Sequence, residues 1–213
     1  MYDAKPTAEA LLDAGAFKIS LDPLFTWTSG IKSPVYCDLR ALISVVKVRE
    51  SIVDGFVEMI KVDGLPEVIA GTATAGIPWA AWVADRLQLP LVYIRGEAKE
   101  HGTKKRVEGM MPQGVKVVLI EDHISTGKSS VSALLALREE ERAIVDRVYA
   151  INTYELMKAA QAFDEIDVKF DTITNYSTIL KVAHERGVID ESQVDLLTDF
   201  RADPAGWAER HSL

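Results

Sequence analysis

The sequence has almost no cysteine, since Cys37 is the only one among 213 residues. A single thiol cannot form an intrachain disulfide, so we expect the protein to function in a reducing compartment. Residues 1–5 also lack the charged and apolar regions of a secretory signal. These absences predict a cytoplasmic location, and Cys37 is interpreted as a small, buried apolar residue.

Long hydrophobic runs are scarce as well. The stretch 68–84 carries no charge, but it is shorter than a typical membrane span and contains Gly71, Gly76 and Pro78. We interpret it as a strand, a loop and a buried helix, and we expect no membrane partner.

Positive charge is in deficit, because 24 Lys and Arg face 32 Asp and Glu, for a net charge of −8. An acidic chain is a poor candidate for binding nucleic acid, although a local basic patch could still bind phosphate. The 48% of hydrophobic and 26% of charged residues are typical of a globular protein with a sizeable core. Disorder, collagen and a disulfide scaffold are excluded, and the length suits a single α/β domain.

Apolar strands alternate with helices over most of the chain. The predicted strands are 67–70, 91–94, 115–120, 145–152 and 170–174. The predicted helices include 6–14, one capped by Ser44, one with Pro78 in its first turn, 128–140, 155–163, and two capped by Ser177 and Asp190. Two short strands, 25–27 and 35–37, surround a turn. Strands rich in Val, Ile and Leu between helices predict a mostly parallel sheet flanked by helices on both faces.

Ligands of such folds bind at the carboxyl ends of the strands. The rule selects four segments: 71–76, 95–109, 121–129 and the turn after Asn152. The first three also carry unusual chemistry.

The strongest signal is the segment 117–130, Val-Val-Leu-Ile-Glu-Asp-His-Ile-Ser-Thr-Gly-Lys-Ser-Ser. A strand ends in two acids, Glu121 and Asp122, and a loop of Ser125, Thr126 and Gly127 then opens a helix. Hydroxyl groups and a helix N-terminus favour phosphate, and the acids can accept hydrogen bonds from sugar hydroxyls. The combination indicates a sugar phosphate. In the alternative interpretation, Asp122 and Ser125 only cap the helix.

A nucleotide-binding P-loop is the obvious competitor, because Gly127-Lys128-Ser129 is similar to the end of that motif. The motif needs a glycine five residues before Gly127, where this chain has Asp122. The P-loop interpretation is therefore rejected.

The same segment resembles the phosphoribosyl-diphosphate motif of the type I phosphoribosyltransferases. In that family the two acids hold the ribose hydroxyls, and the loop holds the 5-phosphate. The resemblance assigns phosphoribosyl-diphosphate binding to Glu121, Asp122, His123, Ile124, Ser125, Thr126, Gly127, Lys128 and Ser129. Lys128 occupies a position that is usually small, so it either strengthens the phosphate site or points to solvent. The motif alone does not select the base.

The segment 95–109 is a basic cluster in an acidic protein, with five Lys or Arg among fifteen residues. A long polar loop flanked by glycines suits a lid, and the alternative is a solvated loop. Its Lys99 and His101 can stabilise a leaving group that gains negative charge. The spacing Arg-x-x-x-Lys-x-His-Gly, followed by Val-Glu-Gly, resembles the catalytic loop of orotate phosphoribosyltransferases, with Arg95 anchoring the base of the lid.

Two further segments resemble the same family. Residues 25–38 are similar to its N-terminal hairpin near orotate, which gives Tyr36 and Cys37, together with Ser125, as orotate-binding residues. The segment 71–78 is similar to its pyrophosphate loop, in which small residues let the backbone approach the ligand. That loop comprises Thr72, Ala73, Thr74, Ala75 and Gly76.

The resemblance implies a type I phosphoribosyltransferase fold in one domain, 1–213, with a small N-terminal hood of roughly residues 1–43 on a core of roughly 44–213. It implies transfer of ribose 5-phosphate from phosphoribosyl diphosphate to orotate, giving orotidine 5′-monophosphate and pyrophosphate in pyrimidine biosynthesis. Lys99, His101 and Asp122 are the expected catalytic residues. Mg²⁺ is expected to be held mainly through the substrate, and a homodimer is expected to share the lid between subunits.

The chain also departs from the family. Gly96 stands where many members have a lysine, and 153–156 offers no match to an arginine that contacts orotate in some members. Two alternatives stay open: transfer to another base, and a non-catalytic sensor of phosphoribosyl diphosphate.

Other conspicuous residues are expected to have structural roles. Trp79 and Trp82 share a helix face and are interpreted as packing residues. The histidines lack partners at metal-ligand spacing, and 138–142 is interpreted as a solvated helix end.

Overall fold

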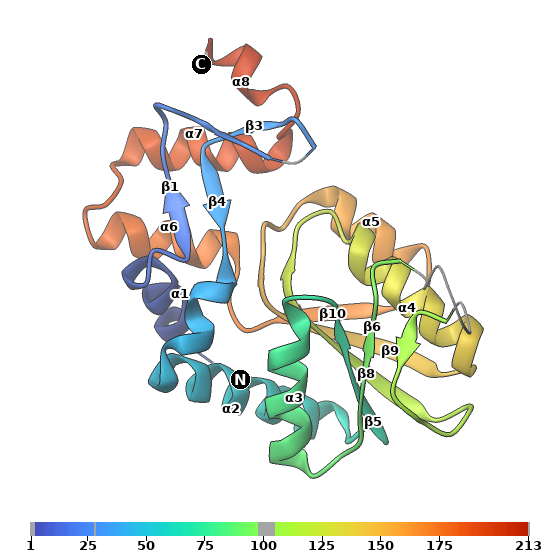
Figure 1. The fold of residues 1–213 in the computed structure, drawn as a ribbon. Coiled ribbons are helices and arrows are strands. Elements are labelled where there is room, and N and C mark those ends of the chain that lie inside the picture. Colours follow the sequence, from blue (N-terminus) through green and yellow to red (C-terminus); the bar gives the residue numbers. More distant parts are fainter. Residues whose placement is uncertain (1–2, 28, 98–104, 213) are drawn as a thin grey trace.

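The computed structural model describes residues 3–27, 29–97 and 105–212 and is built on a six-stranded sheet (Figure 1). The strand order is β10-β9-β8-β5-β6-β7. The strands are β5 (Val68–Thr72), β6 (Leu91–Ile94), β7 (Val107–Glu108), β8 (Lys116–Ile124), β9 (Ile144–Thr153) and β10 (Lys169–Thr172). All neighbours pair in parallel except β6 and β7. The predicted mostly parallel sheet is confirmed, and β7 is the strand of this sheet that was not predicted from the sequence.

Helices cover both faces of this sheet. The face toward the N-terminal part of the chain carries α2 (Val46–Asp63) and α3 (Gly76–Leu87), and the other face carries α4 (Lys128–Glu141) and α5 (Met157–Asp164). The first helix, α1 (Ala4–Asp13), packs against α2 rather than on the sheet. Along β8, Val118 and Ile120 join the first cluster, whereas Val117 and Leu119 join the second. Because both faces are buried, the strand reads as a continuous apolar run.

The chain changes direction across the sheet between β5 and β8. From β5 it passes through α3 to β6 on one side, and from β8 it passes through α4 to β9 on the other. The two outgoing connections leave a crevice at the carboxyl ends of the neighbouring strands, which is where ligands of open α/β sheets bind.

A second group of short strands forms a hood. Here β1 (Phe17–Ile19) pairs with β4 (Val35–Cys37), and β2 (Phe25–Thr26) pairs with β3 (Lys32–Ser33), both antiparallel. The segments predicted at 25–27 and 35–37 do contain strands, but a pairing between them is wrong. A tight turn, in which Trp27 N donates to the carbonyl of Ile31, brings β3 beside β2 before the chain reaches β4.

The C-terminal helices lie beside the hood (Figure 1). They are α6 (Tyr176–Glu185), α7 (Glu191–Ala202) and α8 (Trp207–Arg210), and a 3-10 helix, η1 (Leu39–Ser44), links the hood to α2. The Phe200 ring of α7 packs edge-on against Trp27, with 5.7 Å between ring centroids. The end of the chain therefore contributes to the same unit as its beginning.

Of the three predicted helix caps, one is confirmed and two are wrong. Asp190 caps α7 and forms a capping box with Gln193, as expected. Ser177 is wrong, because Asn175 caps α6 and Ser177 lies inside its first turn. Ser44 is also wrong, because it ends the 3-10 helix and its hydroxyl donates to the carbonyl of Ala41.

The apolar stretch 68–84 forms β5, a loop and the start of α3, as predicted. Among the described residues, no helix is long and apolar enough to cross a membrane. On α3, the Trp79 side chain is fully buried and meets Trp82 edge-on at 5.4 Å, which confirms the packing interpretation.

Candidate active site

The acid pair lies on β8, which continues through Ile124 rather than ending before the acids as predicted. Glu121 is only 4% exposed, and its carboxylate accepts hydrogen bonds from the Ser130 hydroxyl at 2.9 Å and from Asp122 N–H at 3.3 Å. Burial, together with the neighbouring charge of Asp122, raises the pKa of Glu121, and burial also raises the pKa of Asp122. Additional donors, such as sugar hydroxyls, would stabilise the ionised pair.

The loop Ser125–Gly127 leads directly into α4. Gly127 occupies the N-cap position at φ +78, and no side chain caps the helix. The interpretation of Asp122 and Ser125 as helix caps is therefore excluded. A helix start without a capping side chain presents its N–H groups and its positive dipole end to an anion.

The predicted pyrophosphate loop follows β5 and lies beside the acid pair. Gly71 pairs with Ile120 across the two strands, so the loop emerges next to Glu121. A Cβ on Gly76 would lie 2.8 Å from the carbonyl oxygen of Ile120, so only glycine permits this approach. The peptide bond between Ala73 and Thr74 is cis.

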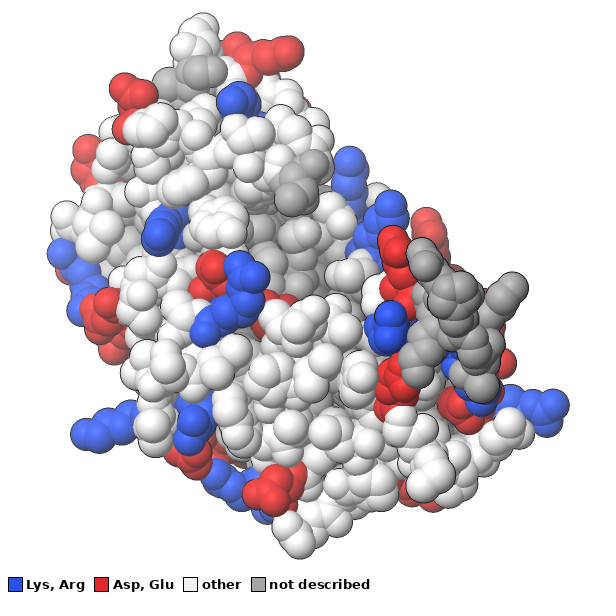
Figure 2. Space-filling view, viewed as in Figure 1, with Lys and Arg blue, Asp and Glu red and all other residues white. Residues whose placement is uncertain are grey.

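Ser125 and Thr126, which follow the acid pair, line a cleft of about 690 Å³ between the hood and the core. Figure 2 shows this face hollowed between the two parts, with lysine and arginine side chains at its margin. The residues that line the cleft are Trp27, Ser29, Ile31, Tyr36, Cys37, His123, Ser125, Thr126, Lys128, Tyr154, Leu156, Met157, Lys158, Arg201, Ala202, Asp203, Pro204 and Ala205. The cleft thus unites both predicted orotate-binding hood residues with the phosphate loop.

An aromatic wall forms one side of the cleft. Tyr154 stacks on Trp27 with ring centroids 5.0 Å apart, and the ring of His123 meets Tyr154 edge-on at 4.2 Å. Burial lowers the pKa of His123 to about 4, so its imidazole is neutral near pH 7. The wall offers a flat, uncharged surface that suits a planar base.

Asn152 connects the hood to the sheet at the cleft. Its amide nitrogen lies 3.8 Å from the sulfur of Cys37 and 3.4 Å from Nδ1 of His123. Burial raises the pKa of the Cys37 thiol, which therefore stays protonated. Cys37 is half-buried with a polar contact, so the expectation of a buried, purely apolar residue is wrong in part.

The remaining predicted site residues differ in how far their side chains are exposed. The Ile124 side chain is 1% exposed and belongs to the cluster on the α4 and α5 face, and its carbonyl accepts the N–H of Tyr154 at 3.2 Å. Ser129 is exposed at the start of α4. Tyr36 is 38% exposed within the cleft.

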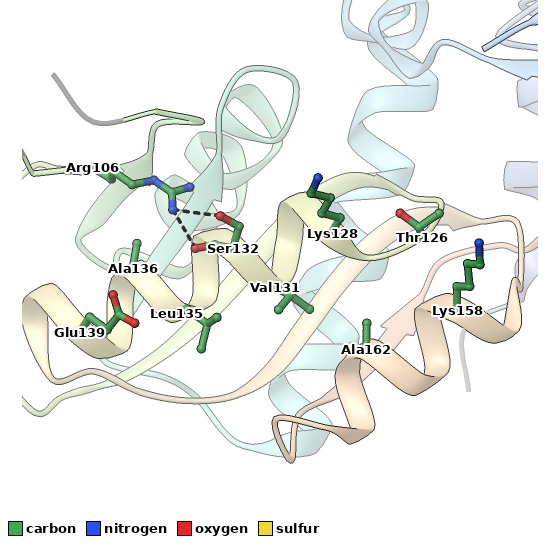
Figure 3. Close-up of a pocket in the computed structure, with 10 residues that line it drawn as sticks. All are labelled: Arg106, Thr126, Lys128, Val131, Ser132, Leu135, Ala136, Glu139, Lys158 and Ala162. Atoms are coloured by element: carbon green, nitrogen blue, oxygen red, sulfur yellow. Dashed lines mark hydrogen bonds between the residues drawn. The ribbon is translucent and has the colours of Figure 1, made fainter. Parts of the chain in front are cut away.

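A second cavity of about 530 Å³ lies outside the cleft, between α4 and α5. Figure 3 shows Lys128 and Lys158 projecting from the starts of these helices on either side of Thr126. All three residues line both cavities, so Lys128 borders the phosphate loop rather than pointing only to bulk solvent.

The ends of the lid segment are joined to each other. Arg95 N–H donates to the carbonyl of Arg106 at 3.0 Å, and the Arg106 guanidinium donates back to the Arg95 carbonyl at 2.9 Å. The Arg95 guanidinium lies 3.7 Å from the carboxylate of Glu108. The expected catalytic residues Lys99 and His101 lie outside the described residues.

The end of α4 holds the second arm of this segment. The Glu140 carboxylate accepts the N–H groups of Arg106 and Val107 at 3.0 and 3.1 Å, and Glu141 pairs with Lys105 at 2.7 Å. The interpretation of 138–142 as a solvated helix end is therefore wrong. A run of charged residues in the sequence is typical of a solvated helix end, so Glu140 and Glu141 were predicted to be solvated. Their partners, residues 105–107, are distant in the sequence and reach them only in the folded chain.

Three residues in or directly behind the cleft wall were not predicted from the sequence. Asn152 had a signal, because it is a polar residue at the end of the apolar strand β9. Lys158 and Arg201 had none, because each lies on an ordinary amphipathic helix.

Comparisons with known proteins agree with this geometry. A model of the phosphoribosyl transferase domain matches residues 49–192. A relative from Fusobacterium nucleatum, named orotate phosphoribosyltransferase, is 49% identical over 196 residues, which cover 90% of this chain and 92% of that protein. The chain belongs to the orotate phosphoribosyltransferase family. A relative of the same name from Enterococcus faecalis is 49% identical over 208 residues, covering 97% of this chain and 98% of that protein.

The structural comparison supports the same conclusion. The crystal structure of orotate phosphoribosyltransferase from Aeropyrum pernix superposes with a TM-score of 0.74 at 31% identity, covering 86% of this chain and 99% of that one. The resemblance to orotate phosphoribosyltransferases and the type I fold are therefore confirmed. The matched domain 49–192 holds the acid pair and both predicted phosphate-binding loops, whereas Trp27, Cys37 and Arg201 lie outside it.

Proposed function

We propose that the cleft binds phosphoribosyl diphosphate and orotate together and that the protein transfers ribose 5-phosphate to the base. The products are orotidine 5′-monophosphate and pyrophosphate, within pyrimidine biosynthesis. The observation that carries the proposal is the junction of β5 and β8. There the small-residue loop lies beside the acid pair, and the uncapped start of α4 borders a cleft with a flat aromatic wall.

In this reaction the bond between ribose C1 and the diphosphate oxygen breaks, and the diphosphate leaves with the electron pair. The base nitrogen bonds to C1 and gives up its proton. The ribose passes through an oxocarbenium-like state while the leaving group gains negative charge. Catalysis then consists mainly of orientation and charge stabilisation.

Each segment of the crevice has a role in this proposal. Glu121 and Asp122 accept hydrogen bonds from the ribose 2′- and 3′-hydroxyls. The loop Ser125–Gly127 and the start of α4 bind the 5-phosphate, since no side chain competes for the helix N–H groups. The loop 72–76 binds the pyrophosphate, which the close approach at Gly76 supports.

Lys99 and His101 are proposed to stabilise the departing pyrophosphate, with Arg95 holding the base of the lid. The joined backbone of Arg95 and Arg106 supports an anchored lid. We also propose that the lid reaches the neighbouring subunit's site in a homodimer, and that the protein is cytoplasmic. The division into a hood and a core within one domain remains part of this proposal, with α7 and α8 lying on the hood side.

Magnesium fits this site as a substrate-borne ion. Among the described residues, no group of three or more His, Cys, Asp or Glu side chains could enclose a metal. The neighbouring carboxylates Glu121 and Asp122 are the acids that the motif supplies. Asp122 is the carboxylate better placed to contact the ion or its water, since Glu121 already accepts from Ser130. When bound, Mg²⁺ would neutralise the diphosphate, with substrate oxygens and water supplying most ligands.

The test is absorbance-monitored consumption of orotate with phosphoribosyl diphosphate and Mg²⁺, omitting each in turn. We expect loss of orotate only when all three are present. Asp122→Asn keeps the shape but removes the charge and should lower kcat/KM by about 100-fold or more. Turnover of a purine base in place of orotate would show a different base specificity, and tight binding of phosphoribosyl diphosphate without any turnover would indicate a sensor.

A further inference from the structure

The hood side of the cleft contains an arginine that neither the motifs nor the matched domain includes. Arg201 belongs to α7 and lines the cleft with Trp27 and Tyr154. The other basic residues in the lining, Lys128 and Lys158, lie beside the phosphate loop at Thr126 (Figure 3). Among the described lining residues, positive charge is thus placed at both the phosphate side and the hood side.

The described residues hold Arg201 through its Nη1 nitrogen. Its Nη1 donates to the hydroxyl of Ser177 at 2.6 Å and to the carboxylate of Glu155 at 3.3 Å. The Glu155 carboxylate is itself fixed, because it also accepts the N–H and hydroxyl of Ser177 at 2.7 and 2.6 Å. Within the described part of the chain, Nη2 and Nε of Arg201 have no hydrogen-bond partner, so its guanidinium keeps donors for a ligand.

The acids near Arg201 are already engaged. Asp203 also lines the cleft, but its carboxylate pairs with Arg210 and accepts the N–H of Gly206. Glu155 orients Arg201 and partly balances its charge while the cleft is empty. An incoming carboxylate would meet the unused edge of a pre-oriented guanidinium, the geometry that favours bidentate recognition.

We propose that Arg201 binds the carboxylate of the base and so selects a carboxylated pyrimidine over an uncharged one. The inference rests on the proposed function, because it assigns a recognition residue to the same cleft. The product carries two separate anionic groups, a phosphate on C5′ of its ribose and a carboxylate on its base. The cleft supplies cations on two sides to match, with Lys128 and Lys158 by the phosphate loop and Arg201 by the hood.

The experiment compares two ligands that differ by that carboxylate alone: orotidine 5′-monophosphate and uridine 5′-monophosphate. Their dissociation constants are measured by isothermal titration calorimetry for the wild-type protein, for Arg201→Gln and for Arg201→Lys. We expect Arg201→Gln to weaken orotidine monophosphate binding by about tenfold or more and to leave uridine monophosphate binding unchanged. Arg201→Lys should recover part of the preference for orotidine monophosphate, because lysine keeps the positive charge but lacks the paired N–H donors of the guanidinium.

The matched control is Arg186→Gln. It removes the same charge from a side chain of similar exposure, 40% against 34%, which pairs with Asp13 instead of lining the cleft. The control should keep the wild-type preference. Equal weakening of both ligands by Arg201→Gln, or no weakening of either, would overturn the inference. If the wild-type protein bound neither nucleotide, the proposed function itself would fail, which is a separate outcome.

Discussion

Gly76 offers the sharpest test of the crevice, because its replacement by alanine adds one methyl group at a known contact. The new carbon would lie 2.8 Å from the carbonyl oxygen of Ile120 and 3.4 Å from Cα of Glu121. Both residues belong to β8, which is paired on one side with β5 and on the other with β9. The strand cannot move easily, so α3 must shift away from it.

The magnitude follows from two opposing effects. Overpacking of this kind costs about 1–3 kcal/mol. Alanine restricts the unfolded chain more than glycine does, which stabilises the folded state by about 0.4–1 kcal/mol. The expected net loss in the free energy of unfolding is about 1–2 kcal/mol, equivalent to a fall in Tm of about 2–8 °C for a chain of this size.

The same shift displaces the loop 72–76 from the acid pair. We therefore expect Gly76→Ala to raise KM for phosphoribosyl diphosphate by about tenfold or more, with a smaller change in KM for orotate. Thermal unfolding and steady-state kinetics measure the two effects.

The matched control for stability is Gly96→Ala. A Cβ there meets no atom of the described residues within 4 Å, so the unfolding free energy of this variant should stay within about 0.5 kcal/mol of wild type. A Gly76→Ala protein with wild-type Tm, or one that is destabilised yet keeps its KM for phosphoribosyl diphosphate, would refute the reasoning.

Three further predictions follow from single side chains. Lys99→Ala should lower kcat by about 100-fold with little change in Tm, and equal losses of both would argue against its place in the lid. Ser130→Ala removes the 2.9 Å donor to buried Glu121, so chemical denaturation should show a loss of about 2 kcal/mol, whereas the exposed Ser129→Ala should show almost none. His123 has a pKa of about 4 when folded and an ordinary value of 6.5, so protons bind the unfolded state preferentially between these values. Stability should therefore fall as pH drops through that window, by up to about 2 kcal/mol near pH 5, and a His123→Leu protein with the same pH slope would contradict the assignment.

The order of strands, helices and motifs was predictable because it depends on neighbouring residues. The apolar run of β8, the acids at its end and the glycine before α4 all lie within one short segment. Their chemistry is local, since a buried strand, two carboxylates and a helix start determine what they can bind together.

Contacts between distant segments were predicted less well. The predicted helix caps at Ser44 and Ser177 were wrong. Ser44 ends a 3-10 helix instead of starting α2, and Asn175 caps α6 in place of Ser177. The pairing of the hood strands depended on how tightly the chain turns after Trp27.

By itself, the sequence determined the family, the phosphate-binding motif and the alternation that builds a parallel sheet. Only the tertiary structure placed Arg201 in the cleft beside Trp27, and only it turned Glu140 toward the base of the lid. The physical reason is separation along the chain. Glu155 and Arg201 are 46 residues apart, and no local pattern of charge or hydrophobicity marks such a pair until folding brings them together.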